Sequence, residues 1–330
     1  MPLFQIGYRR YEGRRTSERL RWWPIAREGL MIAWRSKLLR RLVLVAYLPI
    51  LYFGPVFFAI GRITDPSTDL SRGPWRELAE ETLSRELVAR LREDPTVVRT
   101  AVWALVFTLF ASSIQLILAG LVAAIVGPPL ISQDLRSKAF LLYFSRPISS
   151  VDYLLGKAGT LGGLVAAVTL LPSLVLYVLS IVFSPSLQTV LHTAPVLLDV
   201  VLSSFLVIVP VTLVLLVLSS LTMQPRFAAA AWAVICAFGV MFHHVIKATH
   251  ALAGASWPRL FSLGETVRAA QLSVFDLAGR FEAVPGARLM GLPRDFAADH
   301  GGGGALIFLL VLCASSVVLL LRRIAAPTRI

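Results

Sequence analysis

Six long stretches of the sequence contain no Asp, Glu, Lys or Arg, and their lengths restrict what the chain can fold into. A helix needs about 20 apolar residues to cross the roughly 30 Å of hydrocarbon in a bilayer. Because the backbone must satisfy its own hydrogen bonds in lipid, such stretches favour helices. We therefore predict an all-α membrane protein with six transmembrane helices, in residues 42–61, 101–133, 158–198, 200–224, 227–246 and 305–321.

Composition agrees with this fold class. The 330-residue chain is 56% hydrophobic and 15% charged, whereas soluble domains are about 45–50% apolar and about 25% charged. The third stretch is broken by Ser184, Pro185 and Ser186. Asp199 is the ionisable residue that comes closest to lying within a span, and we expect it at the outer end of the fourth span. A proton-driven carrier or an intramembrane hydrolase would need more ionisable groups there.

Lysine and arginine gather in the segments that a six-span chain places on one side of the membrane. Residues 1–41 hold eleven Lys or Arg against three Glu, and residues 131–157 are also net basic. The positive-inside rule assigns this side to the cytoplasm. We expect a multi-pass plasma-membrane protein, as in a bacterial inner membrane, with both termini cytoplasmic. The positive charge then suits anionic lipid headgroups, and no nucleic-acid partner is predicted.

The tail before the first span has a pattern of its own. Pro24 suits the first turn of a helix, and apolar and basic residues interleave from Ile25 to Arg41. This composition is typical of a helix that lies at the lipid surface, with Trp34, Arg35 and Lys37 as its candidate contact residues. We divide the chain into this tail and interfacial helix, residues 1–41, and a six-helix transmembrane domain, residues 42–330. Lipid anchoring and contact with a partner protein are both open as roles of the helix.

A short polar segment, residues 131–157, separates the second and third spans. Gly127, Pro128 and Pro129 should end or bend the second span. Ser132 can then cap a short amphipathic helix, with Asp134 in its first turn. An Asp134–Lys138 pair has the i, i+4 spacing of a helical ion pair. The residue pattern by itself is also compatible with a solvated connector between the two spans.

The second half of the same segment contains another set of helix signals. Ser145, Arg146 and Pro147 break the first short helix. Ser149 or Ser150 can cap the next helix, and Asp152 lies near its start. The segment therefore reads as a short helix, a turn and a return into the membrane.

This segment resembles the second-to-third connection of ABC transporter permeases, the type-2 exporter family. The resemblance is carried by the pattern LISxDLRSKAxxLYxSRPISxxDYLLGK, which this sequence matches at Leu130, Ile131, Ser132, Asp134–Ala139, Leu142, Tyr143, Ser145–Ser149 and Asp152–Lys157. The specific motif covers about a tenth of the chain, and the six-span topology covers nearly all of it.

The resemblance implies a cytoplasmic coupling helix that docks on a separate ATPase subunit. It implies contact with that ATPase through Ser132, Gln133, Asp134, Leu135, Arg136, Ser137, Lys138 and Arg146. ATP and Mg would be bound by the partner, and two permease subunits, identical or homologous, would pair. The function implied is a permease of an ATP-driven exporter. The alternative is a membrane anchor that transmits ATPase motion to an extracytoplasmic machine and transports nothing itself.

The chain lacks the residues of a nucleotide or metal site. It contains no GxxxxGK[ST] phosphate loop, so we expect no ATPase activity, no catalytic residue and no bound cofactor in this chain. Cys236 and Cys313 lie within spans, without CxxC spacing, and are interpreted as packing residues. His243 and His244 are adjacent and point about 100° apart on a helix, so no metal site is predicted.

Two longer connections, residues 62–99 and 247–303, fall on the side opposite the basic segments. They carry nearly balanced charge, and Trp75–Asp94 has the composition of a helix. We expect both connections outside the cytoplasm, as a shared outer cap that shields the spans or docks an extracytoplasmic partner.

Overall fold

The computed structural model describes residues 20–63, 95–112, 114–139, 148–184, 189–249, 257–282 and 302–325. These residues are helical with short turns, and no strand occurs among them. The longer helices are α1 (Trp22–Trp34), α2 (Lys37–Ile63), α5 (Pro95–Ser112), α6 (Ile114–Arg136), α8 (Ser150–Val168), α9 (Leu170–Val182), α10 (Thr189–Leu221), α11 (Pro225–Thr249), α12 (Leu263–Phe275) and α14 (Gly302–Ala325). Two short elements, η2 (Trp257–Phe261) and α13 (Leu277–Glu282), flank α12.

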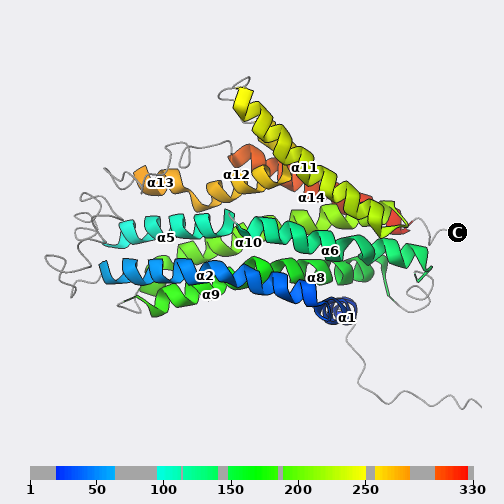
Figure 1. Ribbon diagram of the computed structural model, residues 1–330, viewed down its shortest axis with the longest axis horizontal. Coiled ribbons are helices and arrows are strands. Elements are labelled where there is room, and N and C mark those ends of the chain that lie inside the picture. The colour runs from blue at the N-terminus through cyan, green and yellow to red at the C-terminus, as the bar shows by residue number, and fades with distance from the viewer. Residues whose placement is uncertain are drawn as a thin grey trace, which may run out of the picture.

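Six helical stretches are long and apolar enough to cross a membrane, which confirms the predicted fold class. They are Lys37–Arg62, Arg99–Arg136, Ser150–Val182, Val190–Leu221, Pro225–Ile246 and Gly302–Ile324. Figure 1 shows a long bundle in which α5 continues into α6, and α8 continues into α9. At 1.5 Å per residue, the longer spans exceed the hydrocarbon thickness, so their ends project beyond it.

The fourth span lies at the centre of the bundle. α10 packs against α5, α6, α8, α9, α11, α12 and α14, and it is the most buried of the six spans. It begins at Thr189, ten residues before Asp199. The expectation that Asp199 ends the span is therefore wrong, because the apolar residues before Asp199 continue the same helix. Asp199 instead forms an ion pair with Arg280 of α13.

Aromatic side chains fill one end of the bundle. Phe57 of α2 meets Trp103 of α5 with ring centroids 5.2 Å apart, and Phe107 and Tyr177 lie in the same cluster. Phe275 at the end of α12 is buried there too. We call residues 131–157 the coupling segment. The aromatic cluster and the Asp199–Arg280 pair lie at the end of the bundle opposite the described part of this segment.

Part of the connection between the fifth and sixth spans is integral to the bundle. α12 packs against α10, α11 and α14, with Thr266, Val267 and Ala270 fully buried. In Figure 1, α11 leans away from the other spans, and it is the least buried of the six. The predicted Trp75–Asp94 helix, and its packing against this connection, lie outside the described residues.

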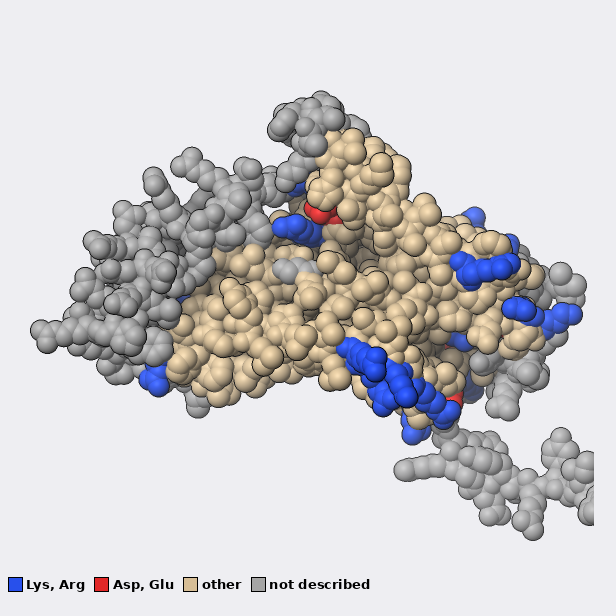
Figure 2. All heavy atoms as spheres, viewed as in Figure 1, with Lys and Arg blue, Asp and Glu red and all other residues tan. Residues whose placement is uncertain are grey.

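One end of the bundle carries most of the described positive charge. Figure 1 places α1, the end of α6, the start of α8 and the end of α14 at this end. Figure 2 shows Lys and Arg side chains gathered there and along α1. We call it the basic end. The described residues of the coupling segment, 131–139 and 148–157, lie at this end (Figure 1).

Candidate functional site

The second span does not stop at its two prolines. α6 stays helical through Pro128 and Pro129 and ends at Arg136. The predicted role of Ser132 as a helix cap is therefore wrong. Ser132 lies inside the helix, fully buried, and its hydroxyl donates to the carbonyl of Pro128 at 2.6 Å. The helix continues because α10 supplies a hydrogen-bonding side chain at this point.

That side chain is Ser219 of α10. Its hydroxyl accepts from the backbone N–H groups of Ile131 and Ser132 at 3.0 Å each and donates to the carbonyl of Pro128 at 2.6 Å. Proline has no N–H to donate and disturbs the ladder around it, and unpaired backbone groups are costly in an apolar interior. Ser219 thus joins α10 to α6 at the start of the coupling segment.

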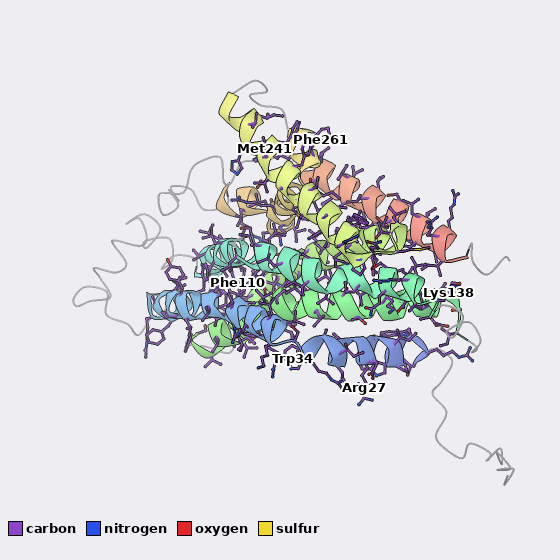
Figure 3. The ribbon with its side chains drawn as sticks, turned by 45° about the vertical axis from the view of Figure 1, so that its right-hand side comes forward. Arg27, Trp34, Phe110, Lys138, Met241 and Phe261 are labelled. Atoms are coloured by element: carbon purple, nitrogen blue, oxygen red, sulfur yellow. The ribbon has the colours of Figure 1, made fainter. Side chains whose placement is uncertain are left out.

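α6 ends in a tight turn. Lys138 has a φ of 55°, the left-handed conformation typical of a helix C-terminus, and the N–H of Ala139 donates to the carbonyl of Asp134 at 3.0 Å. Figure 3 shows Lys138 at the tip of this end. The side chains of Gln133, Arg136, Ser137 and Lys138 are exposed, whereas Asp134 and Leu135 are partly buried. Arg146 lies outside the described residues.

The start of α8 confirms the predicted cap. Ser149 is the N-cap, and its hydroxyl accepts from the N–H of Asp152 at 3.1 Å. The Asp152 carboxylate in turn accepts from the N–H of Ser149 at 3.1 Å, which completes a capping box. These signals are local in sequence, so the pattern alone is enough to find them.

Asp134 pairs with α8 and not with its neighbour in α6. Its Oδ2 atom lies 2.7 Å from the ammonium of Lys157 and accepts from the hydroxyl of Tyr153 at 2.7 Å. The Lys157 ammonium also lies 5.5 Å from the centre of the Tyr153 ring. The predicted Asp134–Lys138 pair is wrong, because Lys138 has left the helical path and Lys157 approaches from α8. We call Asp134, Tyr153 and Lys157 the latch.

α1 lies directly against α8. A methyl carbon built on Gly156 would lie 2.6 Å from Cβ of Ile25, and one built on Gly159 would lie 3.1 Å from Cβ of Ala26. The hydroxyl of Thr160 shares its proton between the carbonyl of Gly156 in its own helix, at 3.1 Å, and the carbonyl of Ala26 in α1, at 3.4 Å. Small residues allow helix backbones to approach this closely. The α8 glycines therefore hold α1 on the bundle.

The predicted interfacial helix is two helices. Trp34 is the last residue of α1, Arg35 follows as its C-cap, and Lys37 begins α2. The break falls at Ser36, whose hydroxyl accepts from the N–H of Leu39 at 3.4 Å. Figure 3 shows Arg27 and Trp34 on the side of α1 that faces away from the other helices. The side chains of Trp34, Arg35 and Lys37 are exposed, so all three are available to lipid or to a partner.

Comparison with known proteins identifies the family. Residues 32–323 match the family described as ABC-2 family transporter protein. No match was found among curated proteins. The matched range covers most of the chain, including all six spans, the end of α6 and the start of α8. The chain therefore belongs to the ABC-2 family of transporter proteins and is a transmembrane permease subunit of an ABC transporter.

Proposed function

We propose that this permease is the membrane subunit of an ATP-driven exporter and that a separate ATPase docks at the basic end. The observation that carries the proposal is the exposed tip of α6, where Arg136, Ser137 and Lys138 project from a firmly held helix end. A force applied to such a tip is passed on to the spans, because Ser219 and the latch join α6 to α10 and α8.

The proposed docking surface differs from the predicted one in two residues. Ser132 is buried and serves the α6 backbone. Asp134 is only 16% exposed and is held by Lys157. The exposed residues Gln133, Arg136, Ser137 and Lys138 therefore make the contact, and Leu135 supports it from the partly buried side. Arg146 remains a proposed member of the surface.

The charge of the α6 tip indicates which kind of partner surface can bind it. The tip exposes two charged side chains, those of Arg136 and Lys138, and both are basic. An ATPase surface with carboxylates opposite them would be steered to the tip and held in register. Two permease subunits and two ATPase subunits make the complete exporter, with ATP and Mg bound by the ATPase subunits. Closure of the ATPase pair moves the tips, and the spans reorient around a substrate path between the permeases.

Site-specific crosslinking tests the docking surface. A photo-crosslinking amino acid at Lys138, in the tagged full-length protein, should capture a soluble ATPase. The matched control places the same amino acid at His192, which is exposed near the start of α10 at the opposite end, and should capture none. A permease that copurifies with no ATPase, or an ATPase captured equally at both positions, would contradict the proposal.

A further inference from the structure

The latch closes the base of the coupling segment from both sides. Asp134 lies two residues before the end of α6, and Tyr153 and Lys157 lie in the first two turns of α8. Both partners bind the same carboxylate oxygen at 2.7 Å. The three side chains therefore join the helix that enters the segment to the helix that leaves it.

Burial makes this junction sensitive to the loss of either charged partner. The side chains of Asp134 and Lys157 are 16% and 11% exposed, and Tyr153 is fully buried. Exposed ion pairs contribute little to stability. Removing one partner of a buried pair is strongly destabilising, because the charge that remains is left uncompensated. Loss of either charged partner should therefore disturb the contact between α6 and α8 at the basic end.

The same part of α8 also holds α1. Gly156 and Lys157 are consecutive in α8. Gly156 faces α1, and the side chain of Lys157 pairs with Asp134 of α6. Thr160, one turn later, donates to the α1 backbone. A displacement of the α6 tip therefore has a continuous path through the latch to α8 and from α8 to α1.

We infer that Asp134, Tyr153 and Lys157 are positioning residues that transmit the motion of the coupling segment to α1, which makes α1 a moving part of the transporter. This inference rests on the proposed function, since an ATPase supplies the motion. α1 then moves with α8 relative to α14, which packs mainly on α10 and α12 and less extensively on α8. Without the latch, the tip of α6 would move while α8 and α1 stayed behind.

Distance measurements between spin labels test the transmission. In the complex with its ATPase, Cys236 and Cys313 are first replaced by Ala, and labels are placed at Met31 of α1 and Leu310 of α14, which are both exposed. Trapping the ATPase with ATP and vanadate should shift the Met31–Leu310 distance by about 2 Å or more, the scale of helix displacements in switching proteins.

Tyr153→Phe keeps the ring but removes the hydrogen bond to Asp134, and Asp134→Asn removes the charge. Both should reduce the distance shift at least twofold while ATP hydrolysis continues. Asp134→Glu should retain the shift, since it restores the carboxylate. The matched control is Tyr177→Phe, which removes a buried hydroxyl bonded to Thr193 at the other end of the bundle and should leave the shift intact.

Three outcomes overturn the inference. The first is a full distance shift in both Tyr153→Phe and Asp134→Asn. The second is an unchanged Met31–Leu310 distance in the wild-type complex although the ATPase is bound and trapped. The third is a twofold loss of the shift in Tyr177→Phe as well, which would show general loosening. If no ATPase binds the wild-type protein, the proposed function itself fails, and this result is recognised before any distance is measured.

Discussion

Replacing Gly156 with Ala adds one methyl group to the contact between α1 and α8. The new carbon would lie 2.6 Å from Cβ of Ile25 and 3.1 Å from the carbonyl oxygen of Trp22, whereas ordinary contact begins at 3.4 Å. Neither neighbour is the flexible end of a long side chain, so the two helices must separate. Overpacking of this kind costs about 1–3 kcal/mol. Because α1 has its own contacts with α2, we expect α1 to loosen without unfolding of the bundle.

Hydrogen exchange of the α1 amides measures this loosening directly, because local opening sets the exchange rate. A loss of about 1–3 kcal/mol should speed exchange over residues 22–34 by about 5- to 150-fold. The matched control is Gly120→Ala in α6, where an added methyl group meets nothing within 4 Å. This control should stabilise its helix slightly, by about 1 kcal/mol. Unchanged α1 exchange in Gly156→Ala, or equal acceleration in Gly120→Ala, would refute the docking of α1 through the α8 glycines.

Three further predictions concern the rest of the bundle. Ser219→Ala should lower the free energy of unfolding by about 1–3 kcal/mol, because the N–H groups of Ile131 and Ser132 lose their acceptor. Thermal unfolding in detergent measures this change. The control Ser315→Ala, which removes an exposed hydroxyl in α14, should change the free energy of unfolding little. Arg280→Met should lower the free energy of unfolding by about 3 kcal/mol, because the charge of Asp199 is left uncompensated. Adding Asp199→Asn to the same chain should recover part of this stability. If the double variant recovers none, the ion pair does not stabilise the fold. A membrane-impermeant thiol reagent applied to intact cells, with the native cysteines replaced, should label His192→Cys and not Ser137→Cys, and the reverse pattern would place the coupling segment outside the cytoplasm.

The parts of the fold that are encoded locally could be predicted from the sequence. The six spans follow from the length of the apolar stretches, and the Ser149–Asp152 capping box follows from two residues three positions apart. The break at Ser36 was missed because basic and apolar residues interleave across it without a proline or glycine.

The parts that depend on distant segments could not be predicted. The pairing of Asp134 with Lys157 requires α8 to return beside α6, and the i, i+4 rule favoured Lys138 instead. Ser132 has the residue type of a cap, but Ser219, 87 residues away, keeps the helix intact around it. The glycines of α8 are a sequence signal for close helix packing, yet only the fold identifies α1 as the neighbour.

The bond from Ser219 to the α6 backbone also constrains how the protein is made. Ser219 follows Ile131 by 88 residues, and a ribosome adds about 5–20 residues per second. The second span therefore leaves the ribosome about 4–18 s before the serine that completes its hydrogen bonds. During that interval, water at the membrane surface or the insertion machinery has to solvate the N–H groups of Ile131 and Ser132. The hydrogen bonds of the second span can therefore be complete only after Ser219 of the fourth span has been synthesised.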